Sequence, residues 1–269
     1  MEEGRYSKAG IYYKCNKFKK GKITLVFIHG LSGSISAWKP YEDLSVKYNL
    51  LFFDLKGHGK SIKPEKYSEC SVESLAQDLA GLIEEVRAEN IVLISHSLGT
   101  LVALAYLDQE KNKAKAALFV SPDYRIGETW RAKFFRPFII SLASVFSFFN
   151  PPKGRGLHID YSDYSKADWN LKRMVADAKN TNVRVYAYCL KFANKFVARG
   201  IFEKIDIPVL IIHGNKDTIF PLGDSTKMVE RIKNAKLKVI KGGNHLLVLN
   251  QTAKVKKEIK EFVENIFKE

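Results

Sequence analysis

The chain has 269 residues, 46% of them hydrophobic, so it can bury a sizeable core in one large domain. Its net charge of +15 comes from lysines scattered among glutamates, a pattern that speaks against a nucleic-acid-binding face. The three cysteines are widely spaced and form no CxxC pair, which excludes a zinc knuckle and a disulfide framework. No signal-peptide pattern opens the chain, and the longest apolar run, 137–149, is too short to span a bilayer. We therefore expect a cytoplasmic protein with at most transient contact with a membrane surface, and its oligomeric state stays open.

Six apolar segments in chain order predict strands that are buried on both faces. They show no alternation of polar and apolar residues, which is typical of a parallel sheet covered by helices on both sides. The segments are 23–30, 49–57, 90–96, 114–122, 208–214 and the weaker 235–243.

Helical patterns lie between these segments. Residues 71–89 carry an apolar stripe after a candidate N-cap, Ser71, and residues 97–110 and 252–268 repeat the helical spacing of apolar residues. Repeated strand–helix units predict an α/β fold with a mostly parallel central sheet flanked by helices.

The alternation stops between residues 123 and 205. This range holds apolar helical stretches but no convincing buried strand, and the strand pattern resumes after it. We interpret 123–205 as an inserted helical cap, with residues 1–122 and 206–269 forming the core domain.

The segment Ser95-His96-Ser97-Leu98-Gly99 follows a predicted strand and opens a predicted helix. It matches G-x-S-x-G with a serine in the first glycine position. In that motif a sharp strand-to-helix turn lifts the central serine above the sheet as a nucleophile. A serine that only caps the helix is the simpler alternative, but the strand–turn–helix context favours a nucleophile.

Four further motifs accompany this turn: "HGLSGS" at 29–34, "DLKGHGKS" at 54–61, "GNKDTIFP" at 214–221 and "GGNHLL" at 242–247. Together with "SHSLG" they resemble the α/β-hydrolase fold superfamily, in its capped serine esterase and lipase branch. The resemblance covers nearly the whole chain and implies an inserted cap above a hydrolase core.

Acyl transfer on this fold needs a nucleophile, an acid and a base in that chain order. The resemblance gives these roles to Ser97, Asp217 and His245, each placed just after a predicted strand. Asp123 is an alternative acid, because some relatives place the acid after the earlier strand. The backbone N–H groups of Leu31 and Leu98 are the expected oxyanion hole.

The expected substrate contacts come from aromatic residues. Trp38 and Trp130 are candidates to border the site, and Phe138 and Phe146 belong to an apolar stretch, 134–149. That stretch fits an acyl pocket and fits plain packing equally well. The sequence offers no metal-ligand cluster and no dinucleotide-binding motif, so we expect neither metal nor cofactor.

The sequence therefore predicts a serine hydrolase of carboxylic esters, such as a carboxylesterase or a monoacylglycerol-lipase-like enzyme, acting on a small ester with an apolar acyl group. The same three residues would also serve hydrolysis of a C–C bond in a β-diketone-like substrate, with Arg131 or Arg136 binding an acidic group. A cofactor-free perhydrolase is a further alternative. A non-catalytic binding protein is disfavoured because nucleophile, acid and base are all present.

Overall fold

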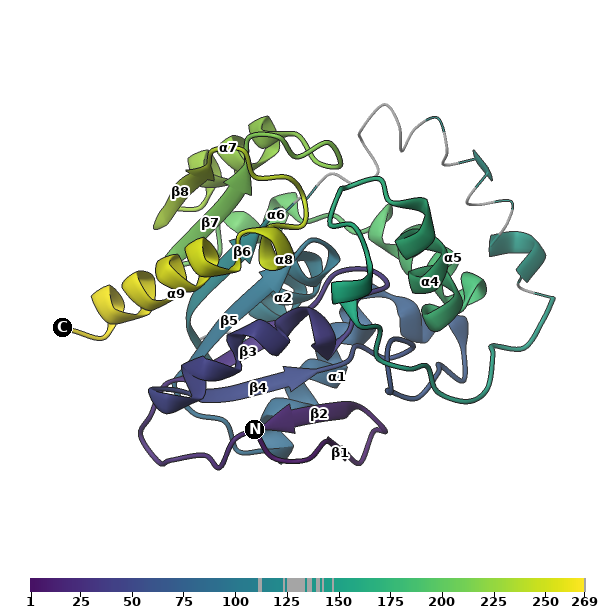
Figure 1. Ribbon diagram of the computed structural model, residues 1–269, viewed down its shortest axis with the longest axis horizontal. Helices are drawn as coiled ribbons and strands as arrows, with labels where there is room; N and C mark the ends of the chain where they lie inside the picture. The colour runs from purple at the N-terminus through teal and green to yellow at the C-terminus, as the bar shows by residue number, and fades with distance from the viewer. Residues whose placement is uncertain are drawn as a thin grey trace.

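The computed structural model describes residues 1–110, 113–122, 124, 134, 137–138, 141, 143–146 and 148–268. The described residues form an eight-stranded sheet in the order β1-β2-β4-β3-β5-β6-β7-β8 (Figure 1). β1 and β2 are antiparallel to their neighbours, and the strands from β3 to β8 run parallel. The strands are β1 Arg5–Tyr6, β2 Tyr12–Cys15, β3 Thr24–Ile28, β4 Asn49–Phe53, β5 Ile91–His96, β6 Ala114–Val120, β7 Val209–Gly214 and β8 Ala235–Ile240.

The six apolar segments of the sequence form the six parallel strands, which confirms the predicted α/β class. The prediction of burial on both faces is wrong for β8, which is the edge strand and leaves Lys236, Lys238 and Val239 exposed. β3 explains why such segments show no polar alternation. Its side chains point alternately to the two faces of the sheet, and both faces are covered. Leu25 and Phe27 pack into one core cluster, and Val26 and Ile28 pack into the other.

Helices and short helical turns connect the strands. The predicted helices 71–89, 97–110 and 252–268 are confirmed within a few residues at their ends. Ser71 caps α1 as expected, because its Oγ accepts a hydrogen bond of 3.1 Å from the Ser74 N–H. The described helical elements are η1 Ile35–Val46, η2 Tyr67–Cys70, α1 Val72–Glu85, α2 Leu98–Gln109, η4 Tyr161–Asp163, α4 Leu171–Thr181, α5 Val183–Ala193, α6 Arg199–Phe202, α7 Leu222–Arg231, α8 Leu247–Asn250 and α9 Thr252–Ile266.

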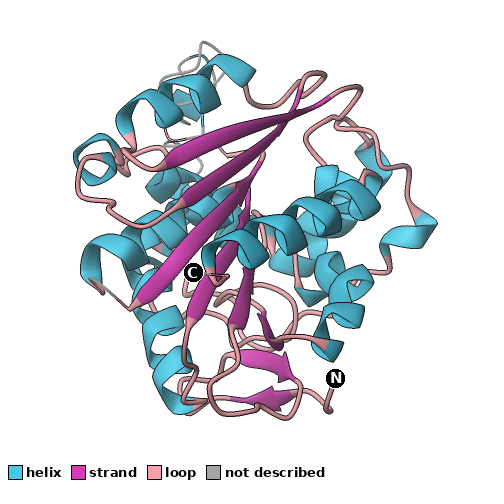
Figure 2. Cartoon of the chain, turned by 90° about the vertical axis from the view of Figure 1, so that its left-hand side faces the viewer, coloured by secondary structure: helices cyan, strands magenta, loops and turns pink. Residues whose placement is uncertain are grey.

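The helices cover both faces of the sheet (Figure 2). On one face, α1, α2, α6 and α7 contribute Leu79, Leu101, Phe202 and Met228 to the same core cluster. On the other face, η1, α8 and α9 contribute residues such as Trp38 to the second cluster. The sheet is therefore a rigid middle layer, and the loops at the ends of its strands are held from both sides.

Helices α4 and α5, from the range predicted as a cap, lie beyond the carboxyl ends of the parallel strands (Figure 1). The buried Lys63 attaches α4 to the core, because its Nζ donates to the carbonyl oxygens of Gly57, Asn180 and Thr181 at 2.6, 3.0 and 3.2 Å. A lysine at these last carbonyls also complements the negative end of the helix dipole. Among the described helices, none is both long and apolar enough to cross a membrane.

Candidate active site

Ser97 stands at the sharp turn between β5 and α2. Its φ of 52° and ψ of −121° lie in a region that residues with a side chain rarely adopt. The turn is held because the Ser97 N–H donates to the Val120 carbonyl of the neighbouring strand at 3.1 Å. Gly99 is required beside it, since a Cβ there would lie 2.5 Å from the Ile28 carbonyl oxygen. The small residues of the motif therefore follow from close backbone packing.

Ser95 occupies the first glycine position of that motif without disturbing the turn. It is fully buried, and its Oγ lies 3.1 Å from the Thr100 Oγ1 in the first turn of α2. A serine fits here because its hydroxyl finds a hydrogen-bonding partner inside the protein.

Ser97, His245 and Asp217 come together in one chain of hydrogen bonds. The Ser97 hydroxyl lies 3.0 Å from His245 Nε2, and His245 Nδ1 lies 2.9 Å from Asp217 Oδ2. Asp217 follows β7 and His245 follows β8, so three strand ends supply the three side chains. With Nδ1 donating to the carboxylate, Nε2 is left as the acceptor of the serine proton.

The Asp217 carboxylate is fully enclosed and densely hydrogen-bonded. Burial alone would raise its pKa, but hydrogen bonds from His213, His245 and the Phe220 N–H hold the pKa well below its usual range. The N–H groups of Ile219 and Phe220 both donate to its Oδ1 at 2.8 Å. Asp217 is therefore ionised at neutral pH and suited to orient a histidine.

A second histidine supports the backbone of His245. His96 is the last residue of β5, and its Nε2 donates to the His245 carbonyl oxygen at 3.0 Å. Burial, together with the neighbouring His245, lowers the pKa of His96 to about 3. His96 is thus a neutral donor that fixes the loop after β8.

The loop after β3 is held by His29. Its Nδ1 donates to the Gly30 carbonyl oxygen at 2.8 Å, and its Nε2 accepts from the Leu55 N–H at 3.0 Å. Leu31 in this loop and Leu98 at the start of α2 line the same cavity as Ser97. The two residues expected to form the oxyanion hole therefore stand at the site.

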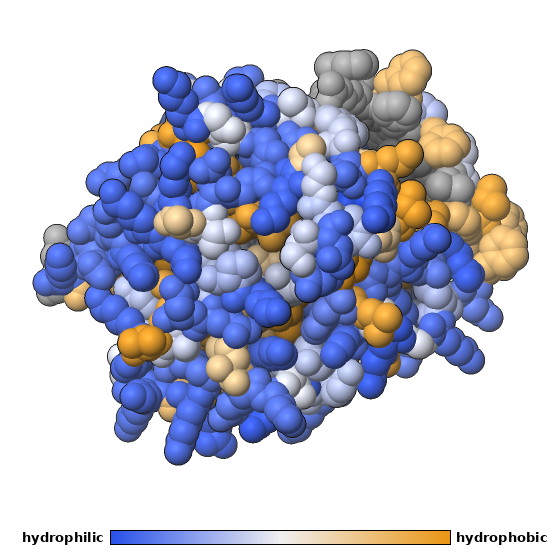
Figure 3. Space-filling model, in the orientation of Figure 1, coloured by the Kyte–Doolittle hydropathy of each residue, from blue (hydrophilic) through white to orange (hydrophobic). Residues whose placement is uncertain are grey.

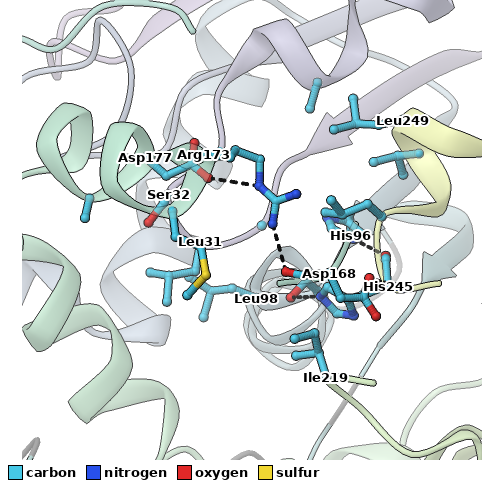
Figure 4. A pocket seen from close by; sticks show the side chains of 18 of the residues that line it. Leu31, Ser32, His96, Leu98, Asp168, Arg173, Asp177, Ile219, His245 and Leu249 are labelled. Carbon is cyan, nitrogen blue, oxygen red and sulfur yellow. Dashed lines mark hydrogen bonds and ion pairs between the residues drawn. The ribbon is translucent and has the colours of Figure 1, made fainter. Parts of the chain in front are cut away.

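Asp217 lies buried behind His245, and Ser97 and His245 face a cavity of about 480 Å³ beneath α4 and α5. Its wall is mainly apolar, with a few polar groups (Figure 4). This balance is typical of a pocket for a small, mostly apolar molecule. The apolar side chains that line it are Leu31, Ala37, Leu98, Met174, Ala178, Leu190, Ala193, Ile219, Phe220, Leu246, Val248 and Leu249.

A family model for the α/β hydrolase fold matches residues 23–252, which is most of the chain. The chain belongs to the α/β hydrolase fold family. The family resemblance of the five sequence motifs is thereby confirmed.

Individual α/β hydrolases are similar to this chain at low identity. Protein ABHD8 of Homo sapiens is 23% identical over 252 residues, which cover 92% of this chain and 56% of that protein, so the chain spans just over half of its length. The probable lysophospholipase L2 of Haemophilus influenzae is 24% identical, with 82% of this chain and 76% of that protein covered. A solved thermophilic esterase from Thermogutta terrifontis has a TM-score of 0.73 at 19% identity and covers 95% of this chain and 94% of its own, which shows a shared fold.

The three described aromatic residues that were expected at the substrate do not line the cavity of this α/β hydrolase. Trp38 is fully buried in the core, with its ring 5.1 Å from that of Phe27. Phe138 is 65% exposed, and Phe146 packs beside a small cluster around Tyr188. Trp130 and the alternative acid Asp123, like Arg131 and Arg136, lie outside the described residues.

The segment that carries Phe138 presents apolar side chains to solvent instead. These residues lie over the cap range, at the right-hand side of Figure 3, where the hydrophobic colour gathers. A high density of phenylalanine does not distinguish a pocket wall, packing against the core and an exposed face, and for this reason the sequence left the role of residues 134–149 open. The exposed apolar residues described there are Phe134, Phe138, Val145, Phe148 and Phe149.

Sequence reasoning missed Asp168, which connects the cap range to the two loops of the trio. Its Oδ1 accepts from the His245 N–H at 2.9 Å. Its Oδ2 accepts from the N–H and the hydroxyl of Thr218, next to Asp217, at 3.0 and 2.8 Å. One carboxylate therefore holds the backbone of His245 and that of Thr218, the residue after Asp217. Asp168 lies outside the five motifs that resemble the family, so no sequence signal singles it out.

Arg173 of α4 holds the segment that presents Asp168. It is nearly buried, and its guanidinium donates to the carbonyl oxygens of Ala167 at 2.7 Å and Asp168 at 3.0 Å. Figure 4 shows Arg173 between Asp177 and Asp168. Within the part of the chain that the structure describes, no group of three His, Cys, Asp or Glu residues could hold a metal ion.

Proposed function

We propose that the protein is a serine hydrolase that cleaves carboxylic esters through an acyl-enzyme on Ser97. One observation carries the proposal: the chain of hydrogen bonds from Ser97 through His245 to Asp217, at 3.0 and 2.9 Å, opens into an apolar cavity. This arrangement supplies a nucleophile, a base and an orienting carboxylate in reach of one another.

The first half of the reaction forms the acyl-enzyme. Ser97 Oγ attacks the ester carbonyl carbon while His245 Nε2 takes the hydroxyl proton. The carbon–oxygen bond to the alcohol then breaks, and His245 returns the proton to the leaving oxygen. Asp217 remains ionised throughout, and its negative charge stabilises the imidazolium that His245 becomes.

The negative oxygen of the tetrahedral intermediate needs fixed donors. The backbone N–H groups of Leu31 and Leu98 suit this role because backbone amides do not reorganise as the charge develops. His29 supports the geometry by fixing the carbonyl of Gly30, the residue before Leu31.

The second half hydrolyses the acyl-enzyme. Water attacks the acyl carbonyl as His245 Nε2 takes one of its protons, and the proton then passes to Ser97 Oγ as the acyl bond breaks. The products are a carboxylic acid and free enzyme, so atoms and charge balance without a cofactor.

The cavity favours an ester with an apolar part of modest size. Apolar side chains make up most of its wall, and each methylene that moves out of water into such a wall contributes up to about 0.8 kcal/mol. Among the similar proteins, one is named a lysophospholipase and another an esterase, and both names agree with ester cleavage.

The proposal is tested by labelling with a fluorophosphonate and by intact-protein mass spectrometry. We expect one adduct on the wild-type protein and none on Ser97→Ala. Ser95→Ala is the matched control, because it removes the neighbouring serine of the same motif, and it should still be labelled. An equal adduct on Ser97→Ala would show that another residue is the nucleophile. A parallel panel of simple esters and β-diketones then separates ester cleavage from C–C cleavage.

A further inference from the structure

The cap-side wall of the cavity contains an ion pair with unusual placement. Arg173 and Asp177 lie one helical turn apart on α4, and their side chains are only 8% and 17% exposed. Figure 4 shows the pair among the residues of the cavity. A pair at this spacing normally lies on the solvent face of a helix, because removing two charges from water is costly.

The Asp177 carboxylate is poorly satisfied by its neighbours. Arg173 Nε lies 3.6 Å from Oδ2, and the Tyr161 hydroxyl reaches Oδ1 only at 3.5 Å. Both contacts are longer than a good hydrogen bond. Burial raises the pKa of Asp177 to about 6, and Arg173 and Tyr161 offset this only in part. The carboxylate therefore has acceptor capacity left toward the cavity.

The charges of the pair restrict what can bind there. An anionic group would face the carboxylate of Asp177, and the Arg173 guanidinium already donates to the carbonyls of Ala167 and Asp168. A cationic group would face the guanidinium. A neutral hydrogen-bond donor meets neither repulsion and supplies what the carboxylate lacks.

We propose that Asp177 binds a neutral hydrogen-bond donor, a hydroxyl or an amide N–H, that the otherwise apolar substrate carries away from its scissile bond. The proposal rests on the ester-hydrolase function for the kind of bond cleaved and adds the substrate class: esters with one neutral polar group.

The test measures binding, so that it does not depend on turnover. Isothermal titration of the Ser97→Ala protein compares matched pairs of esters. One pair is the methyl ester of ω-hydroxyhexanoate against methyl heptanoate, and a second is monohexanoylglycerol against propyl hexanoate. A third is an ω-acetamido ester against the ketone in which a methylene replaces the N–H. The first two pairs test a hydroxyl as the donor, and the third pair tests an amide N–H.

We expect the donor-bearing member of at least one pair to bind about tenfold more tightly or better. Asp177→Leu in the same background should reduce that preference to nearly one. Asp177→Asn keeps an acceptor oxygen, so it should retain part of the preference and also serves if the leucine variant does not fold. Asp163→Asn, which changes an exposed carboxylate of the same segment, should retain all of it.

Equal affinities within all three pairs would overturn the proposal, and so would a preference that survives in Asp177→Leu. The proposed function is judged separately, by hydrolysis of plain esters by the wild-type protein. Hydrolysis through Ser97 with equal affinities in every pair would leave the function standing and remove the subsite. A binding preference for the donor-bearing esters without any ester hydrolysis would support the subsite and overturn the proposed function.

Discussion

The floor and the roof of the cavity are built by different means. The floor presents Ser97 and His245, with the Asp217 carboxylate buried behind them, and the backbone places each of the three after a parallel strand. The roof consists of α4 and α5, which reach the core through side-chain contacts such as Lys63 and Asp168. A floor held by backbone geometry tolerates little change in sequence. A roof held by side chains can be altered residue by residue, so it is where specificity can diverge.

The largest expected effect is on the floor. Asp217→Asn should lower kcat by about 10⁴, because the amide no longer holds His245 in the tautomer that accepts the serine proton. Steady-state kinetics with a simple ester measures this, and the melting temperature checks that the variant folds. Asp123→Asn is the comparison. A large loss there with little loss in Asp217→Asn would move the acid to the end of β6.

Asp168→Ala tests whether contacts from the roof segment position the loops that carry Asp217 and His245. Loss of the acceptor for the His245 and Thr218 N–H groups should lower kcat by about ten- to a hundredfold, since small displacements of catalytic groups are costly. KM should change much less, because Asp168 holds the loops through their backbone. Asp168→Glu or →Asn should recover part of the rate. If KM alone changed, Asp168 would be a substrate contact and not a positioning residue.

Leu190→Ala and Phe138→Ala compare a residue that lines the cavity with an exposed one from 134–149, the stretch for which an acyl pocket was one of two interpretations. Leu190→Ala should shift the preferred acyl chain to longer esters. Each added methylene should change kcat/KM by up to about fourfold, from about 0.8 kcal/mol of burial. Phe138→Ala should leave the chain-length profile as it is. A shift of the chain-length profile in Phe138→Ala but not in Leu190→Ala would show that residues 134–149 form the acyl wall.

The smallest expected effect is on stability. The pKa of Asp177 rises from 3.8 to about 6 in the folded protein, so the folded state holds its proton more tightly than the unfolded state does. The stability from this group is present at low pH and is lost as the pH rises from about 4 to about 6.

Asp177→Asn removes that ionisation. It should therefore raise the melting temperature by a few degrees at pH 7 and by much less at pH 4. The other groups that titrate or carry charge beside Asp177 are the Arg173 guanidinium, which is cationic at both pH values, and Tyr161 and Tyr186, which are neutral at both because burial raises their pKa values above 10. An equal shift at both pH values would mean that the effect is not electrostatic.

The sequence predicted what depends on backbone rules. The six parallel strands follow from apolar runs, and the meeting of Ser97, Asp217 and His245 follows from their positions after strands of one sheet. The roof could not be predicted in this way. Trp38 and Phe138 were chosen by residue type, whereas burial in the core or exposure to solvent depends on how distant segments pack. Asp168 and Arg173 act through carbonyl and N–H partners, which leave no pattern in the sequence.

The backbone angle of Ser97 has a consequence for laboratory selection of heat-stable variants. A residue with a side chain pays on the order of 1–3 kcal/mol for such a conformation, whereas glycine adopts it without steric penalty. Ser97→Gly should therefore be among the simpler routes to a higher melting temperature. A screen for thermal tolerance that does not also demand turnover will tend to enrich the substitution that removes the hydroxyl on which the proposed chemistry depends.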